Sequence, residues 1–218
     1  MDEGNLLILT IYFIIVSYVF YSMYDALDQL ISIEVNQGFI KEQLEKQNLQ
    51  DSLEISFKFK DQYKPENFAD IPIKGINKTD MYSLYLDWEQ MSLTDLNGRS
   101  HRVIRLIPGM KLQLSQPQVF TIVAPGQIVE EKLTLESSLE ATEHGFKIAK
   151  PLFDAKKLRQ AAEQQKRFSL RVMIQFAQMT AGKRETQLHI IVCEFIIKKT
   201  PWQKAIAWKP NKSGKPKP

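Results

Sequence analysis

The stretch TDLNGRSHRVIRL, residues 94–106, holds the densest group of side chains that could do chemistry. A serine beside a histidine suggests nucleophilic catalysis, and clustered arginines suggest phosphate binding. However, Ser100 and His101 are adjacent, and adjacent residues of a strand point to opposite faces. Asn97-Gly98 is a strong signal for a tight hairpin turn. The stretch therefore predicts an exposed hairpin tip, with a candidate contact surface at Arg99, His101 and Arg102.

The remaining reactive residues do not form a recognisable catalytic or metal-binding pattern. His189 and Cys193 share a strand face but lie about 13 Å apart at the rise of a β-strand. The glycines are isolated turn residues, and the single cysteine and three histidines lack zinc-ligand spacing. An enzyme would have to gather residues remote in sequence, such as Asp87, His101 and Glu194. We therefore expect a non-enzymatic protein without a cofactor or metal.

Residues 5–24, NLLILTIYFIIVSYVFYSMY, carry no charged side chain. Twenty helical residues span about 30 Å, which is the thickness of the hydrocarbon core of a bilayer. A buried core helix would show a polar stripe, and a cleavable signal peptide would have a basic start and a small-residue cleavage site. The sequence predicts an uncleaved transmembrane anchor over residues 1–24. Its anchoring side chains are Leu6, Leu7, Ile8, Leu9, Ile11, Phe13, Ile14, Ile15, Val16, Val19, Phe20, Tyr21 and Tyr24.

The orientation of this anchor depends on a small difference in basic residues. No Lys or Arg precedes the span, and the first one after it is Lys41. Positive residues favour the cytoplasmic side, so the soluble domain is predicted to be cytoplasmic, with the extracytoplasmic side left open. We expect a single-pass protein of an inner or plasma membrane.

The chain ends in a basic tail, residues 201–218, and the last 21 residues hold seven lysines and no acid. Lysines interleaved with tryptophans suit an anionic bilayer surface. The alternative is a solubilising tail, and nucleic-acid binding is unlikely because the middle of the chain is nearly neutral. The candidate lipid contacts are Lys198, Lys199, Trp202, Lys204, Trp208 and Lys209.

Between the anchor and the domain, residues 25–50 show apolar side chains at three- and four-residue spacings, including Leu27, Leu30, Ile40 and Leu44. This pattern predicts a helical juxtamembrane stalk. A coiled coil is the alternative, but the periodic stretch is too short for three or four heptads.

Residues 51–200 alternate apolar and polar side chains over seven or eight short segments separated by turn residues. A single internal helix is expected near residues 152–167, with Asp154 as its N-cap. A phase shift after Trp88 suggests a β-bulge near Glu89 and Gln90. Strands in series with one helix predict an antiparallel immunoglobulin-like β-sandwich behind a transmembrane helix, although the Cys…Trp…Cys hallmark is absent.

Two stretches, LDWEQMSLTDLNGRSHRVI and VFTIVAPGQIVEEKLTL, resemble bacterial membrane-anchored or lipoprotein-type Ig-like sandwich domains of unknown function. The resemblance consists of a Trp-bearing strand, a polar turn, a His-Arg-Val return strand and a later Pro-Gly turn. It implies an accessory role in the bacterial envelope and supplies no catalytic residue.

These observations favour a membrane-anchored binding or assembly module whose partners are the lipid bilayer and another protein at the membrane. The alternative is a membrane-tethered ligand sensor or transport accessory subunit, with a pocket between the sheets or at the loops.

Overall fold

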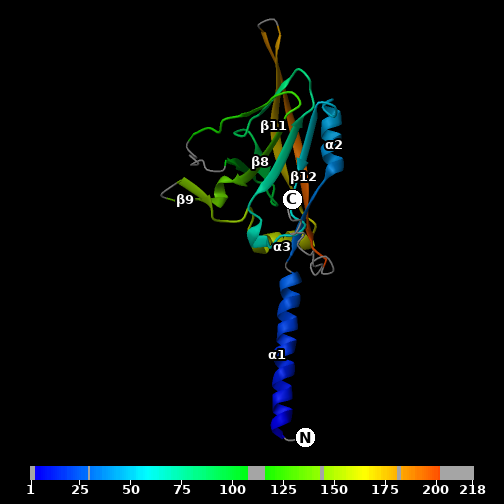
Figure 1. Ribbon diagram of the computed structural model, residues 1–218, viewed down its shortest axis with the longest axis vertical. Helices are drawn as coiled ribbons and strands as arrows, with labels where there is room; N and C mark the ends of the chain where they lie inside the picture. The colour runs from blue at the N-terminus through cyan, green and yellow to red at the C-terminus, as the bar shows by residue number, and fades with distance from the viewer. Residues whose placement is uncertain (1–2, 29, 108–115, 143–144, 181–182, 202–218) are drawn as a thin grey trace, which may run out of the picture.

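The computed structural model describes the chain except for residues 1–2, 29, 108–115, 143–144, 181–182 and 202–218. Helix α1, Glu3–Asp28, projects away from a separate β domain (Figure 1). Its segment Gly4–Ser22 is long and apolar enough to cross a membrane. None of this segment is buried, and most of its apolar side chains are exposed, with Ile14 at 64% and Phe20 at 67%. No described residue of the β domain therefore covers Gly4–Ser22.

The β domain contains two helices and a set of antiparallel strands. Helix α2 spans Gln37–Lys46 and α3 spans Ala155–Glu163, with short 3-10 turns η1 at Pro65–Asn67 and η2 at Glu136–Ser138. The strands are β1 Ile31–Val35, β2 Leu53–Phe57, β3 Ile71–Asn77, β4 Ser83–Leu86, β5 Ser92–Thr94, β6 Ser100–Leu106, β7 Thr121–Val123, β8 Ile128–Leu135, β9 Leu139–Thr142, β10 Gly145–Ile148, β11 Arg167–Thr180 and β12 Lys183–Lys199.

Ten of these strands form one hydrogen-bonded sheet in the order β1-β12-β11-β5-β6-β8-β3-β2, with β4 also paired to β11 and β7 paired to β4. The two ends of this order approach each other just after β2. There the backbone N–H groups of Ile31 and Tyr63 each donate to the other residue's carbonyl, at 3.0 and 2.8 Å. The sheet is therefore a nearly closed barrel. The immunoglobulin-like sandwich is not confirmed, because the strands are paired in series around one connected sheet.

The helical stalk predicted for residues 25–50 is wrong, because Ile31–Val35 is a strand of the barrel. β1 pairs antiparallel with the end of β12, from Ile31 opposite Lys199 to Val35 opposite Phe195. Helix α2 follows at once, and Asn36 caps it by accepting from the N–H of Phe39 at 3.2 Å. Three of the apolar residues that suggested a stalk, Ile31, Ile40 and Leu44, are buried core residues, and Leu30 is partly buried. Ile33 of β1 is buried with them.

The phase shift after Trp88 marks a turn between two strands and not a bulge within one. β4 and β5 both pair with β11, at Ile174–Ala177 and Ser169–Arg171 respectively. The turn between them is held by Asp87, whose Oδ1 accepts from the N–H groups of Glu89 and Gln90 at 3.2 and 3.3 Å. The two strands then continue to different partners, β4 to β7 and β5 to β6.

Helix α3 forms where the sequence predicts an internal helix, with Asp154 as its N-cap. The helix lies at the end of the barrel nearest α1 (Figure 1), and its residues Leu158, Ala161 and Ala162 are buried. An aromatic cluster fills this end, and the rings of Phe153 and Phe168 lie 5.1 Å apart. Phe68 and Phe195 complete the cluster. The helix therefore covers the end of the core that lies nearest α1.

Cys193 lies on β12 inside this core and is fully buried. Burial raises the pKa of its thiol to about 12, so the thiol stays protonated at neutral pH. Because the thiolate is the reactive form, Cys193 serves as an apolar core residue.

Candidate functional site

The hairpin between β5 and β6 is organised by the carboxylate of Asp95. Its Oδ1 accepts from the backbone N–H groups of Asn97 and Arg99, at 2.8 and 2.9 Å. Gly98 takes a positive φ of 78° and donates its N–H to the Asp95 carbonyl at 3.1 Å. Asn97-Gly98 therefore forms the tight turn that the sequence predicts.

His101 on β6 completes the contacts of Asp95. Its Nε2 lies 3.0 Å from Asp95 Oδ2. Partial burial of Asp95 acts to raise its pKa, but the N–H groups of Arg99 and Asn97 together with His101 outweigh burial. The pKa of Asp95 therefore lies below its usual value. The carboxylate is ionised at neutral pH and holds His101 in place.

Arg102 is engaged on the opposite face of the same strand. Its Nη2 donates to both carboxylate oxygens of Glu89, at 2.8 and 2.9 Å. The hydrogen bond from Arg102 is the main reason that the pKa of Glu89 lies below its usual value. A second carboxylate, Glu136, lies 3.4 Å from Nη1. Of the three residues predicted as a contact surface, His101 and Arg102 thus have strong intramolecular partners, whereas Arg99 is exposed at the tip.

A second polar cluster joins β6 to the segment before β7. Arg105 lies over the ring of Trp88, 5.4 Å from the ring centroid, and contacts Thr121 and Glu131. Gln118 donates to the carbonyls of Val103 and Trp88 at 2.7 and 3.2 Å. These contacts join β6 to the segment before β7 at the place where β6 passes from β5 to β8. We therefore assign this cluster to stability.

Helix α3 approaches the Asp95 hairpin from the other side. Lys157, Gln160 and Ala161 lie at spacings of three and four residues and share one helix face. Asp154 accepts from the N–H groups of Lys156 and Lys157, both at 3.1 Å, so its carboxylate is used as the helix cap. Lys166 follows the helix, and its N–H donates to the carbonyl of Ala161 at 2.8 Å.

The hairpin and α3 enclose a cleft of about 330 Å³, which we call the hairpin–α3 cleft. This volume lies at the lower end of the range for small-molecule sites, about 300–1,000 Å³. One part of its lining is apolar, and the other carries the polar groups of the hairpin and the helix. The lining residues are Asp95, Leu96, Asn97, His101, Leu135, Ser137, Leu152, Phe153, Asp154, Lys157, Gln160, Ala161 and Lys166.

The hairpin–α3 cleft is lined by two aspartates and two lysines, so its formal charges balance, but the two kinds of group differ in their partners. Asp95 is paired with His101, and Asp154 is bound by backbone N–H groups. In contrast, Lys157 and Lys166 make no ion pair with any residue that the structure describes. The cleft thus offers two ammonium groups beside an imidazole and an apolar floor, which is an arrangement suited to an anion with an apolar part.

Sequence reasoning identified the hairpin but missed the other wall of this cleft. Lys157 and Lys166 lie about sixty residues after Asp95, and nothing in their local sequence distinguishes them from solvent-exposed lysines. The triple considered for an enzyme, Asp87, His101 and Glu194, is not brought together. Asp87 holds its own turn, His101 contacts Asp95, and Glu194 pairs with Arg167 at 3.1 Å and Asn36 at 2.7 Å. Within the described chain, no group of metal-ligating residues is found.

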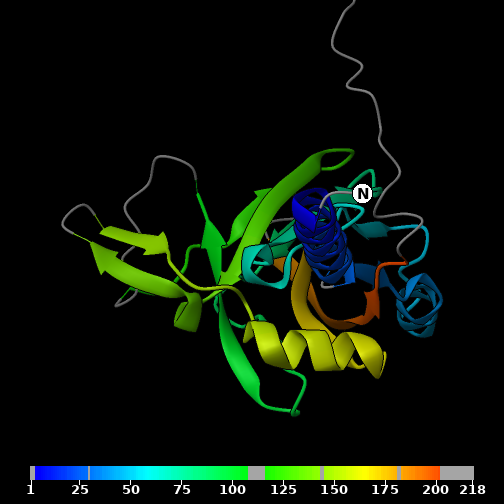
Figure 2. The ribbon, with the colours of Figure 1, turned by 90° about the horizontal axis from the view of Figure 1, so that it is seen from below.

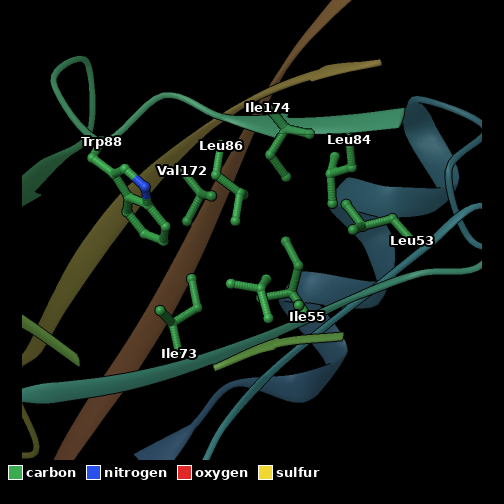
Figure 3. Close-up of a pocket in the computed structure, with 10 residues that line it drawn as sticks. Leu53, Ile55, Ile73, Leu84, Leu86, Trp88, Val172 and Ile174 are labelled. Carbon is green, nitrogen blue, oxygen red and sulfur yellow. The ribbon is translucent and has the colours of Figure 1, made fainter. Parts of the chain in front are cut away.

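The interior of the barrel was the other place predicted for a ligand. Leu53, Ile55 and Ile73 point across it toward Leu86, Trp88, Val172 and Ile174 (Figure 3). These side chains leave only about 10 Å³ for solvent. A single water needs about that much room, so the described interior holds no small-molecule pocket.

The predicted lipid-contact residues lie at the end of β12. Lys198 forms an ion pair with Glu34 on β1, and Lys199 lies opposite Ile31. Thr200 then donates its N–H to the carbonyl of Leu30 at 2.9 Å, so the tail starts beside the end of α1. Trp202, Lys204, Trp208 and Lys209 lie outside the described residues.

The effect of Asp95 on stability is testable by substitution. Asp95→Ala removes two backbone hydrogen bonds and the His101 contact, so we expect it to lower the free energy of unfolding by about 1–3 kcal/mol at neutral pH. Because the folded pKa is depressed, this stabilisation is complete above the unfolded pKa of about 3.9 and is lost as pH falls through the folded value. Urea unfolding near pH ~7 and pH ~3 checks both points. A difference that grows toward acid pH, or an equal effect of the exposed control Asp51→Ala, would contradict the assignment.

Comparison with known proteins finds no relative for this chain. No family model matches it, and neither a curated protein nor a solved structure matches significantly. Its function must therefore be inferred from its own residues.

Proposed function

We propose that this chain is a single-pass membrane protein in which α1 holds a barrel-like binding module at the bilayer surface. The observation that carries the proposal is the unpartnered apolar segment Gly4–Ser22. Its 19 residues extend about 28 Å as a helix, close to the hydrocarbon thickness of about 30 Å. Side chains such as Leu9, Phe13 and Ile15 are exposed, and a bilayer would remove them from water.

A binding role is supported by where the hairpin–α3 cleft lies. Helix α3 forms one wall of the cleft and lies across the end of the domain next to α1 (Figures 1 and 2). The carboxylate of Asp95 holds the hairpin turn through hydrogen bonds. Lys157 lines the cleft, where its positive charge attracts an anion. The described lining contains no cysteine, and its only imidazole is held by Asp95. These features favour binding over catalysis.

We also propose a cellular location for the protein. The resemblance around Trp88 and His101 implies an accessory protein of the bacterial envelope, and the position of Lys41 favours a cytoplasmic domain. The filled barrel interior gives no support to the alternative of a sensor with a ligand pocket between sheets. We also propose that the domain binds a protein partner at the membrane.

The proposal predicts that arginines in the middle of α1 release the protein from membranes. Each arginine at the centre of a span costs about 2.5–3.5 kcal/mol, so Leu9→Arg combined with Ile15→Arg should abolish stable insertion. Alkaline washing of membranes from expressing cells, followed by detection in pellet and supernatant, measures this. The wild-type chain should stay in the pellet at its full-length mass.

The matched control places two arginines on exposed apolar positions of the β domain. Met81 is 66% exposed and Leu188 is 62% exposed, so Met81→Arg with Leu188→Arg makes the same chemical change outside α1. This variant should remain in the pellet. Loss of the control from the membrane, or retention of the α1 variant, would overturn the role proposed for α1.

A further inference from the structure

We propose that the hairpin–α3 cleft binds the phosphate-bearing head group of an anionic phospholipid from the bilayer that holds α1. The inference rests on the membrane anchoring proposed above. It assigns a ligand class to the cleft and gives the domain a second contact with the membrane.

The backbone links the wall of the cleft to the point where the chain leaves α1. The carbonyl of Lys166 accepts from the N–H of Ile197 at 3.0 Å. Three residues later, Thr200 bonds to Leu30, just beyond the end of α1. Three strand residues span about 10 Å. Figure 2, viewed from the α1 side, shows α3 lengthwise beside the axis of α1. The cleft is therefore close to the layer of lipid head groups.

The lysines of the cleft supply the positive charge that a phosphate needs. Lys157 and Lys166 line it without an ion-pair partner among the described residues, and His101 adds a third nitrogen donor or acceptor. The two carboxylates of the lining are occupied, Asp95 by His101 and by N–H groups and Asp154 by N–H groups. A lysine near a membrane surface attracts anionic lipid because phosphate and ammonium pair in a low-dielectric layer.

The apolar lining of the cleft favours a lipid over a simple inorganic ion as the ligand. Leu152, Phe153 and Ala161 are buried residues of the core that also line the cleft, and Leu135 joins them from β8. A hydrated phosphate gains nothing from such a surface, whereas the glycerol and upper acyl part of a phospholipid does. The combination of ammonium groups above apolar side chains thus favours the lipid source.

The test uses the full-length protein in mild detergent, titrated with phosphatidylglycerol or phosphatidylcholine while bound lipid is counted by native mass spectrometry. Wild type should prefer phosphatidylglycerol. Lys157→Gln with Lys166→Gln should weaken phosphatidylglycerol binding by about 30-fold, given the usual contribution of two lysines at a membrane surface. Lys157→Arg with Lys166→Arg should bind phosphatidylglycerol as wild type does, because arginine keeps the positive charges that glutamine removes.

The matched control is Lys156→Gln with Lys147→Gln, which removes two exposed charges outside the cleft. Binding by this control should stay within about 2-fold of wild type. An equal loss in both variants would show general charge attraction, and no loss in the cleft variant would show that the lipid binds elsewhere. Either result overturns the proposal.

A competition arm distinguishes the two sources of phosphate. Glycerol 3-phosphate should displace the lipid only weakly, because it lacks the acyl chains that contact the floor. Displacement at concentrations equal to those of the lipid would assign the cleft to a soluble phosphate and overturn the lipid source. If the alkaline wash leaves the chain in membranes but lipid selectivity is absent, only the cleft assignment fails. Release by the wash overturns the anchoring itself.

Discussion

A fragment that begins at residue 51 is expected to aggregate on expression, whereas one that begins at Leu30 should fold. The shorter fragment lacks β1 and α2, which together bury Ile31, Ile33, Ile40 and Leu44. Burial of each aliphatic side chain contributes about 1.5–3 kcal/mol, so their loss removes about as much as the 5–15 kcal/mol that stabilises a typical domain. It also leaves the edge of β12 unpaired from Phe195 to Lys199, which favours aggregation.

Soluble yield, circular dichroism and thermal melting of fragments 30–200 and 51–200 check this expectation. A third fragment that begins at Gln37 keeps α2 but lacks β1, so it isolates the contribution of the strand. If the fragment from residue 51 melts cooperatively at the temperature of the longer one, then residues 31–46 are not part of the folding unit.

Trp88→Ala should destabilise the domain by about 3–5 kcal/mol, the usual cost of removing a large aromatic side chain from a core. Trp88 is 1% exposed and lines the barrel interior beside Val172 and opposite Ile73 (Figure 3). Its Nε1 donates to Thr121 Oγ1 at 2.8 Å. Its ring also supports the guanidinium of Arg105, so truncation exposes a charged group to a new cavity.

Urea unfolding of the fragment 30–200 measures the loss. Trp88→Phe is the matched variant, because it keeps an aromatic ring and removes the hydrogen bond to Thr121. We expect it to cost about 1–2 kcal/mol from that bond, plus a smaller packing change. A cost below about 1 kcal/mol for Trp88→Ala would mean that the interior collapses around the gap, and it would contradict the close packing described here.

Part of the fold followed from local sequence because the signals that produce it are local. The alternation in residues 53–57 predicts a strand, Asn97-Gly98 predicts the tight hairpin, and Asp154 predicts the start of a helix. In each case a few neighbouring residues determine the backbone conformation. The apolar run of residues 5–24 likewise predicts a helix without reference to the rest of the chain.

Other elements depend on partners that are distant in sequence. Ile31–Val35 has apolar residues that fit a helical pattern as well as a strand, and its pairing with β12, more than 150 residues later, selects the strand. The sandwich prediction is not confirmed for a related reason. Alternation shows that strands are half-buried, but hydrogen bonding decides whether they close into one sheet or stack as two.

In the candidate site, too, local sequence predicts one part and strand pairing decides the other. The sequence by itself determined the hairpin, including Asp95 as a polar residue at its tip, and the apolar helix that precedes the domain. Only the tertiary structure placed Lys157 and Lys166 opposite that hairpin. β5 pairs with β11 at Ser169–Arg171. This pairing brings the start of β11 beside the hairpin, and α3 directly precedes β11 in the chain. A cleft between segments sixty residues apart exists only once those strands are paired, because no local interaction connects its two walls.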